Sequence, residues 1–289
     1  MVIIQLLINS LVIGSIYALI ASGFSLIYKS NKFFHFAHGA VVAFCGYIFY
    51  FLFSLLNFNL ILSVLFSLIF SGLLGAFFFY EIFSPLRKKN SSKLVLLLIS
   101  VALMIILQNI ILLLFGANTK LIRLTSQKIF VFLGATITPV EICIIGIAVL
   151  LFFILSYVMK KTKFGRNIRA ISGSEELSEV VGINPDKTLA GAFILSSLIA
   201  GIAGILIGIE QNLNSTMGTM LSIKGFIGAV IGGIASVPGA IIGSYILGFI
   251  ENFGTWYLSS GYKDLISFII LFLFLLLKPE GLFGGNKRK

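Results

Sequence analysis

The sequence predicts an all-α protein, a polytopic bundle with about 8–9 membrane elements, because apolar runs of roughly 20 residues recur along it. The chain of 289 residues is 58% hydrophobic and only 11% charged, and its mean hydropathy is +1.10. A soluble domain usually has about a quarter of its residues charged. The net charge of +11 does not indicate nucleic-acid binding, because the basic residues lie in short clusters between the apolar runs.

The first half of the chain contains four apolar runs, each followed by polar residues that end it. Asn57 and Asn59 predict a tight turn between the second and third runs, and the loop 85–93 carries Arg87, Lys88, Lys89 and Lys93. The four predicted spans are residues 2–28, a span that follows HFAHGA (35–40) and ends near 56, a span that ends at 81, and 94–115.

The second half begins with a polar, irregular segment at 116–138 and then predicts spans at 139–159 and 188–210. A polar loop is expected at 212–222, followed by a short Gly-rich run at 224–236. Val237-Pro238-Gly239 breaks this run before a second piece at 240–253 and a last span at 265–277. The region 224–253 is either one long kinked span or a half-helix followed by a span, and such interrupted segments often line translocation paths.

The distribution of basic residues predicts which ends of the spans are cytoplasmic. If the loops after the first, third and fifth spans and the C-terminal tail lie inside, 16 of the 21 basic residues are cytoplasmic. The N-terminus is then outside, and 224–253 counts as two elements. The five basic residues left outside are Lys120, Arg123, Lys128, Lys224 and Lys263.

The segment 160–187 is a short charged element in this apolar chain, and it predicts an amphipathic helix at 173–181. Ser172 lies three residues before Glu175, the spacing of a capping box, and Gly182 is suited to end the helix. Two turns of helix are unstable alone in water, so another surface must hold them. Leu177, Val180 and Val181 are spaced to share one face.

No constellation for catalysis is evident, and we expect neither an enzyme nor a bound cofactor or metal. His35 and His38 have no acid beside them to complete a metal site, and the chain has neither a phosphate-binding P-loop nor a G-x-S-x-G motif. ATP, if it is used, must therefore bind to another chain.

Several polar and Gly residues in the apolar runs allow both a structural and a functional interpretation. His38 has a structural role if it caps a helix or forms a hydrogen bond with a neighbouring carbonyl. Because it lies near a membrane span, it is also a candidate functional residue. Gln108 and Asn109 either link helices or line a pore, and Gly pairs such as Gly228 with Gly232 allow close helix packing. Glu251 lies deeper in its run than the other glutamates.

The segment FGRNIRAISGSEELSEVVGINPDKTLAGAFILSSLIAGIAGIL (164–206) resembles the coupling region of ABC-transporter permeases, and specifically the branched-chain amino-acid permeases of the LivH/LivM type. Further motifs of that family follow in its order over nearly the whole chain. The FAHG, Gly-rich and YKD motifs are similar to the LivH-like half of the pair, although His35 stands where the family pattern has Asn. These motifs are YALIASGFSLIY (17–28), FAHG (36–39), LQN (107–109), KGFIGAVIGGIASVPGAIIGSYILGFIE (224–251), YKD (262–264) and Pro279-x-Gly281.

The resemblance implies a type II-like importer permease of one transmembrane domain, 1–289, with a cytoplasmic coupling segment at 160–187. It implies pairing with a second, LivM-like permease, two ATP-binding subunits that hold ATP and Mg, and an extracytoplasmic substrate-binding protein. The chain would lie in a bacterial or archaeal plasma membrane, the inner membrane where there are two, in contact with lipid.

The resemblance also implies roles for individual residues. Nucleotide-driven closure of the ATPases would move the coupling segment and reorient the spans. The residues expected to couple to the ATPase are Gly165, Arg166, Arg169, Glu175, Glu176, Leu177, Glu179, Val180, Val181 and Gly182. The residues expected on the substrate pathway are His38, Gly39, Gln108, Asn109, Gly225, Gly228, Gly232, Gly233, Pro238 and Gly239.

Other functions remain open at this point. A permease for urea, short amides or other amino acids would share these motifs. An ion-coupled secondary transporter would show a mid-membrane acid or His relay and often inverted repeats, of which the chain offers at most Glu251. An assembly subunit without a pathway would not need the interrupted Gly-rich segment.

Overall fold

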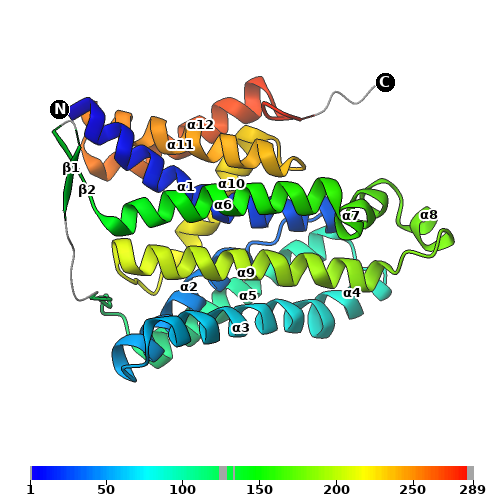
Figure 1. The fold of residues 1–289 in the computed structure, drawn as a ribbon. Coiled ribbons are helices and arrows are strands. Elements are labelled where there is room, and N and C mark those ends of the chain that lie inside the picture. Colours follow the sequence, from blue (N-terminus) through cyan, green and yellow to red (C-terminus); the bar gives the residue numbers. More distant parts are fainter. Residues whose placement is uncertain (1, 124–128, 133, 285–289) are drawn as a thin grey trace.

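The computed structural model describes residues 2–123, 129–132 and 134–284 as an elongated bundle of helices (Figure 1). The first long helix, α1 (Val2–Asn31), is followed by a short extended segment and by α2 (Ala37–Tyr50). A π-helical turn, η1 (Phe51–Leu55), continues α2 to the turn that Asn57 and Asn59 predicted. Asn59 caps the next helix, because its side chain accepts from the backbone N–H of Ile61.

The third span is longer than the apolar run that predicted it. α3 (Leu60–Phe77) continues through a π-helical turn, η2 (Phe78–Phe83), into α4 (Ser84–Lys88). The predicted loop at 85–93 is therefore only a few residues long. α5 (Lys93–Phe115) follows it and begins at Ser92, whose hydroxyl accepts from Val95 N–H.

The segment before the fifth span is not wholly irregular. β1 (Phe130–Phe132) and β2 (Ala135–Ile137) form an antiparallel hairpin in which Phe130 lies opposite Ile137. α6 (Pro139–Lys161) then begins with a complete capping box between Thr138 and Glu141.

The charged segment forms two short helices, α7 (Lys163–Gly173) and α8 (Glu175–Val180), before α9 (Pro185–Gln211) crosses back. Figure 1 shows α7 and α8 at one end of the bundle, opposite the N-terminus and the hairpin. Lys128 and residues 285–289 lie outside the described residues, so the tail cations at 287–289 are not placed.

The C-terminal part is α10 (Met217–Gly232), α11 (Val237–Tyr257), the short 3₁₀ turn η3 (Ser260–Tyr262) and α12 (Lys263–Leu277). The predicted polar loop at 212–222 ends earlier, because α10 begins at Met217. Lys224, which was predicted to begin the Gly-rich run, therefore lies in the middle of a helix and is buried. The break predicted at Val237-Pro238-Gly239 is present: α10 and α11 meet at an angle of 113°.

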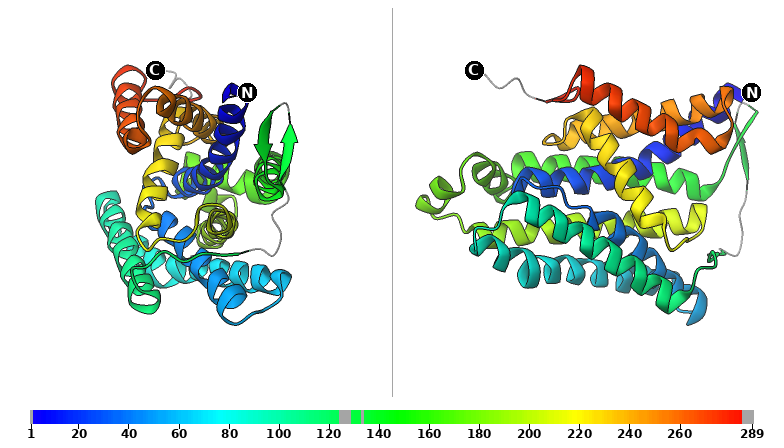
Figure 2. Two further views of the ribbon diagram at one scale, coloured as in Figure 1. Left: turned by 90° about the vertical axis from the view of Figure 1, so that its left-hand side faces the viewer. Right: turned by 180° about the vertical axis from the view of Figure 1, so that it is seen from behind.

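Within the described residues, six helices are long and apolar enough to cross a membrane, or seven if the bent pair α10 and α11 is one span. α12 is a further apolar helix of 15 residues. α1 and α9 lie inside the bundle (Figure 2), whereas the outer helices α3, α5 and α6 expose large apolar side chains. Leu113 is 85% and Phe153 64% exposed. This pattern is the one expected of a bundle surrounded by lipid.

Candidate functional site

The projecting helix α8 is held by caps at both ends, and its N-cap is Ser174. Ser174 is extended (φ −152, ψ 123), and its hydroxyl accepts from Leu177 N–H at 3.3 Å. The predicted cap, Ser172, is wrong: it lies in the last turn of α7. That turn persists because Ile168 and Ile171 of α7 are buried in the core.

The C-terminus of α8 ends at Gly182, as the sequence predicted. Gly182 has φ +82, its N–H donates to Glu179 O at 2.9 Å, and Ile183 N–H donates to Ser178 O at 3.0 Å. These two bonds form a Schellman motif, which satisfies carbonyls that the helix end leaves free. A helix of six residues is thereby fixed in shape without extensive packing.

The apolar face of α8 points into solvent. Leu177, Val180 and Val181 are 69%, 83% and 72% exposed. Burying such side chains is worth roughly 1.5–3 kcal/mol each. Three exposed apolar residues on one capped helix therefore form a surface suited to a partner protein.

The acidic residues of α8 differ from one another in whether they form ion pairs. Glu175 forms an ion pair with Arg87 of α4, with 2.5 Å between Glu175 Oε1 and Arg87 Nη2. A second pair, Lys88 with Asp186 at 3.1 Å, ties α4 to the start of α9. Among the described residues, Glu176 and Glu179 form no ion pair and are exposed.

The basic residues of α7 shape the turn between α6 and α7. Arg169 donates a hydrogen bond to the carbonyl of Met159 in the last turn of α6, so its guanidinium is used within this chain and links α7 to α6. A Cβ on Gly165 would lie 2.3 Å from Met159 O and 2.4 Å from Val158 O, a clash that explains Gly at this position. Arg166 is exposed.

Of the predicted pathway residues, His38 and Gly39 lie inside the bundle. His38 is 1% exposed and packs against Gly23 of α1, and its Nδ1 is 3.5 Å from the hydroxyl of Ser196 on α9. A Cβ on Gly39 would be 2.1 Å from Ser222 Oγ of α10. Gly39 therefore allows α2 and α10 to approach closely, and His38 packs between α1 and α9.

The extended segment before α2 is buried, and side chains satisfy its backbone. Ser100 of α5 donates to Phe34 O at 3.1 Å and accepts from Phe36 N–H at 3.2 Å. Ser222 donates to Phe36 O at 2.7 Å. Non-helical backbone inside a membrane protein needs such partners.

An aromatic cluster surrounds this segment, with ring centroids 5.5–6.4 Å apart. Two of the rings come from the segment beside His38, and the other two are contributed by α1 and α10. No spacing in the sequence brings these distant positions together. The rings belong to Phe24, Phe34, Phe36 and Phe226.

The predicted pair Gln108 and Asn109 is divided between two environments. Gln108 accepts a hydrogen bond from the hydroxyl of Thr219 at 2.8 Å, which joins α5 to α10. Asn109 is exposed on the outer face of α5, where its amide donates to Ile105 O at 2.8 Å.

The predicted glycines pack α10 and α11 against each other and against α1. Cβ atoms on Gly232 and Gly239 would each lie within 2.3 Å of the other's carbonyl oxygen, and one on Gly228 would lie 2.3 Å from Ser244 Oγ. Gly225 faces Ile20 of α1, and Gly233 adopts φ +102 at the break. Pro238 is exposed in the first turn of α11.

A network of ion pairs and hydrogen bonds, which the sequence did not predict, joins four helices, α1, α10, α11 and α12. The ammonium of Lys224 contacts Glu251 at 2.5 Å, Asp264 at 2.9 Å and Ser267 at 2.8 Å. Tyr17 donates to the other oxygen of Glu251 at 2.9 Å. Glu251 is fully buried and Lys224 is 6% exposed. The signal in the sequence was the depth of Glu251 in its run, but its partner lay 27 residues earlier.

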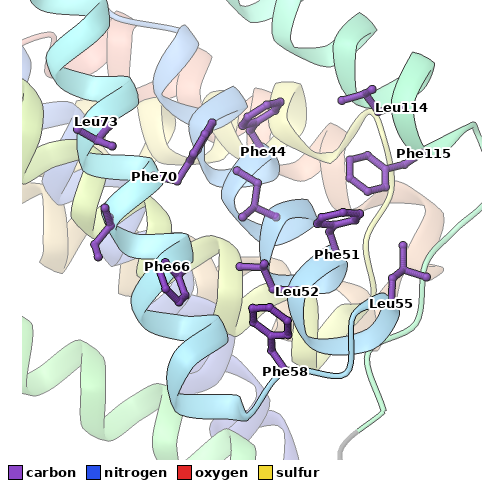
Figure 3. A pocket seen from close by; sticks show the side chains of 12 residues that line it. Phe44, Phe51, Leu52, Leu55, Phe58, Phe66, Phe70, Leu73, Leu114 and Phe115 are labelled. Carbon is purple, nitrogen blue, oxygen red and sulfur yellow. The ribbon is translucent and has the colours of Figure 1, made fainter.

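An apolar groove of about 680 Å³ lies between α2, α3 and α5 (Figure 3). Phe44, Phe51, Phe66 and Phe115 point into it, and all twelve lining residues are Phe, Leu or Ile. It offers nothing to an ammonium or carboxylate group. The described residues also contain no group of three His, Cys, Asp or Glu placed to hold a metal ion.

Comparison with known proteins identifies relatives over nearly the whole chain. A family model described as branched-chain amino acid transport system / permease component matches residues 6–275. The high-affinity branched-chain amino acid transport system permease protein BraD of Pseudomonas aeruginosa is 32% identical over 97% of this chain and 95% of its own length. LivH of Escherichia coli strain K12, which has the same description, is 31% identical with the same coverage.

A solved structure has the same fold. PsaBC from Streptococcus pneumoniae in complex with a Fab superposes with a TM-score of 0.52, covering 95% of this chain and 92% of that chain. The two sequences are 13% identical, so this comparison concerns the fold alone.

Proposed function

The chain belongs to the branched-chain amino acid transport permease family, and from this we propose that it is the LivH-type permease of an ATP-binding-cassette importer that translocates leucine, isoleucine and valine. It is a multi-pass membrane protein and a transporter subunit, not an enzyme. Residues 1–289 act as one transmembrane domain, with the coupling segment at 160–187.

The observation that carries the proposal is the exposed apolar face of α8. A capped helix outside the bundle, with Leu177, Val180 and Val181 in solvent, is suited to enter a groove of a cytoplasmic ATPase subunit. The neighbouring ion pair between Arg87 and Glu175 ties α8 to α4. Movement of the ATPase would thus reach the bundle through side-chain contacts as well as through the chain.

We propose that the remaining partners are a second, LivM-like permease, two ATP-binding subunits and an extracytoplasmic binding protein. ATP and Mg bind to the ATPase subunits, and the complex lies in the plasma membrane. Figure 2 (left) shows α10 between α5 and α12 on one side of the bundle, where the second permease would pack. α10 packs against Gly39 of α2 and forms a hydrogen bond from Thr219 to Gln108 of α5. Because Gly39 and Gln108 are predicted pathway residues, these contacts support a substrate path along this side.

The proposal is tested by ATP-dependent uptake of labelled leucine into proteoliposomes that contain this chain with its partner subunits. A Val180→Asp variant should lose uptake by at least about tenfold, because a carboxylate cannot be buried unpaired in an apolar groove. Val180→Ile is the matched control and should retain uptake, since the face stays apolar.

Each outcome distinguishes a different alternative. Loss of both uptake and ATPase subunit retention in Val180→Asp, with the protein still inserted, supports the coupling assignment. Uptake that follows a proton or sodium gradient and ignores ATP contradicts the ABC function. ATP-dependent uptake of urea or a short amide in place of leucine changes the substrate and keeps the machinery.

A further inference from the structure

A polar cleft of about 710 Å³ opens at the coupling end of the protein, between α8 and the bundle. One wall is the C-terminus of α1 together with the turn between α4 and α5. The other wall is α8 with the start of α9. The acidic residues of α8 line this cleft, whereas its exposed apolar residues Leu177, Val180 and Val181 do not. An ATPase docked on the apolar face therefore leaves the cleft to another ligand.

The cleft has equal numbers of positive and negative side chains, and the two kinds lie on opposite walls. The bundle wall has Lys32, Arg87, Lys88 and Lys93, and the opposite wall has an equal number of carboxylates. Two of these carboxylates are already paired, with Arg87 and with Lys88. Among the described residues, two cations, Lys32 and Lys93, and two anions, Glu176 and Glu179, form no ion pair. Such an arrangement favours a ligand with one charge of each sign over an anion or a cation.

Within the part of the chain that the structure describes, two buried polar atoms of residues at the cleft have no hydrogen-bond partner. Asn31 is 9% exposed, and its amide nitrogen donates to Ser30 Oγ at 2.8 Å while its Oδ1 accepts nothing. Arg87 uses Nη2 for Glu175, and its Nη1 has no partner. Unmet buried groups of this kind are costly. One is an acceptor and the other a donor, but both are shielded from solvent. A ligand in the cleft would therefore meet the exposed charges that form no ion pair among the described residues.

The cleft also has an apolar part. Leu96 of α5 and Ile171 of α7 are 4% and 5% exposed and line it, beside Pro185 at the start of α9. These side chains lie among the charged ones, so an aliphatic group attached to a dipolar head would contact both kinds of surface. An inorganic anion would leave the apolar part and the acidic wall unused.

We propose that this cleft binds a zwitterionic α-amino acid with an aliphatic side chain from the cytoplasm, and that the bound molecule slows transport. The ligand is then the transported substrate itself, so this inference rests on the proposed function. Its carboxylate contacts Lys93 and Lys32, and its ammonium contacts the carboxylates of Glu176 and Glu179.

The inhibitory direction follows from the position of the cleft. A ligand that bridges α8 and the bundle wall binds best when the two are close, and it stabilises that arrangement. Transport requires the coupling helix to move with the ATPase. Accumulated substrate inside the cell would therefore hold the permease in one of its states.

The test measures binding and inhibition separately. Equilibrium binding of labelled leucine is measured on the assembled permease and ATPase subunits in nanodiscs, without the binding protein. Initial uptake rates are then measured in proteoliposomes preloaded with unlabelled leucine. Lys93→Met should weaken both leucine binding and inhibition by internal leucine by about tenfold. Lys89→Met is the matched control: it removes a neighbouring exposed lysine that does not line the cleft.

Leucinamide and 4-methylpentanoate, which lack the carboxylate and the ammonium respectively, should each bind at least about tenfold more weakly than leucine. Uptake that is independent of internal leucine in the wild type overturns the inference and leaves the proposed function intact. Equal leucine binding by Lys93→Met and Lys89→Met also overturns it, since the bound molecule would then lie in the translocation path. Absence of ATP-dependent uptake of any branched-chain amino acid contradicts the proposed function instead.

Discussion

At the residue scale, Lys224 is the side chain whose environment differs most from what the sequence indicated. Its three ammonium hydrogens meet three acceptors, on Glu251, Asp264 and Ser267. The ammonium thus fastens α10 to α11 and α12. A buried pair of this kind adds little net stability, but the loss of one partner leaves an uncompensated charge.

Lys224→Met should therefore destabilise the protein by about 3–5 kcal/mol, because Glu251 would remain buried without its cationic partner. The melting temperature of the purified complex in detergent measures this effect. A Lys224→Met/Glu251→Gln double variant should recover much of the loss. Equal melting temperatures for the single variant and the wild type would contradict the role of the network.

The sequence predicted individual residues well where a local rule governs them and poorly where distant segments meet. The left-handed Gly182 follows from its place at a helix end, and it was confirmed. Ser172 and Ser174 both satisfy the local cap rule, and only the burial of Ile168 and Ile171 decides between them. The ring of Phe226 joins the cluster around Phe34 through tertiary packing, which no spacing encodes.

At the element scale, α8 depends on its caps more than on packing, and Gly182 is the position to test. Nothing lies within 4 Å of a Cβ placed there, so a substitution acts only through the backbone at φ +82. Gly182→Ala should raise the free energy of the capped helix by roughly 1–2 kcal/mol. Faster hydrogen exchange of the α8 amides and weaker retention of the ATPase subunits are the expected results.

Gly173→Ala is the matched control, because Gly173 also has open space around it but lies within α7 without a positive φ. It should leave exchange in α8 unchanged and slightly strengthen α7. Equal effects of the two substitutions would mean that the backbone conformation at Gly182 is not what fixes α8.

Helix boundaries in the apolar runs were predicted to within a few residues, except at the start of α10, which lies seven residues before the predicted run, and at the end of the third span. The third span was expected to end at Glu81, before Pro85 and a cluster of cations. It continues to Lys88 because the π-helical turn at 78–83 shifts the helix register before the proline. Pro85 then lies in the first turn of α4, where a missing N–H costs little.

At the scale of the whole molecule, the alternation of apolar runs and basic loops was enough to predict the fold class and the grouping of charged loops at one end. Figure 1 shows α7 and α8 at the end opposite the N-terminus, as the basic residues indicated. The close packing of α10 and α11 at 113° was not predictable, since Gly spacing alone does not say which helices meet.

Single cysteines at the two ends of α9 test this orientation, in a background without Cys45 and Cys143. Gln211→Cys should react with a membrane-impermeant maleimide in intact cells, and Lys187→Cys only after permeabilisation. Both positions are exposed at opposite ends of one helix. The reverse pattern would place the coupling segment outside and contradict the topology.

The backbone bonds at the end of α10 have a consequence for the order in which the chain is assembled. Leu282 and Phe283, which follow α12, donate to the carbonyls of Ile231 and Gly232. The α10–α11 hairpin therefore lacks two of its hydrogen bonds until the ribosome has synthesised α12 and the residues beyond it. A nascent chain stopped within α12 would leave these two carbonyls without partners inside the bundle, which is costly in free energy. The last steps of translation thus complete a structure that was begun many residues earlier.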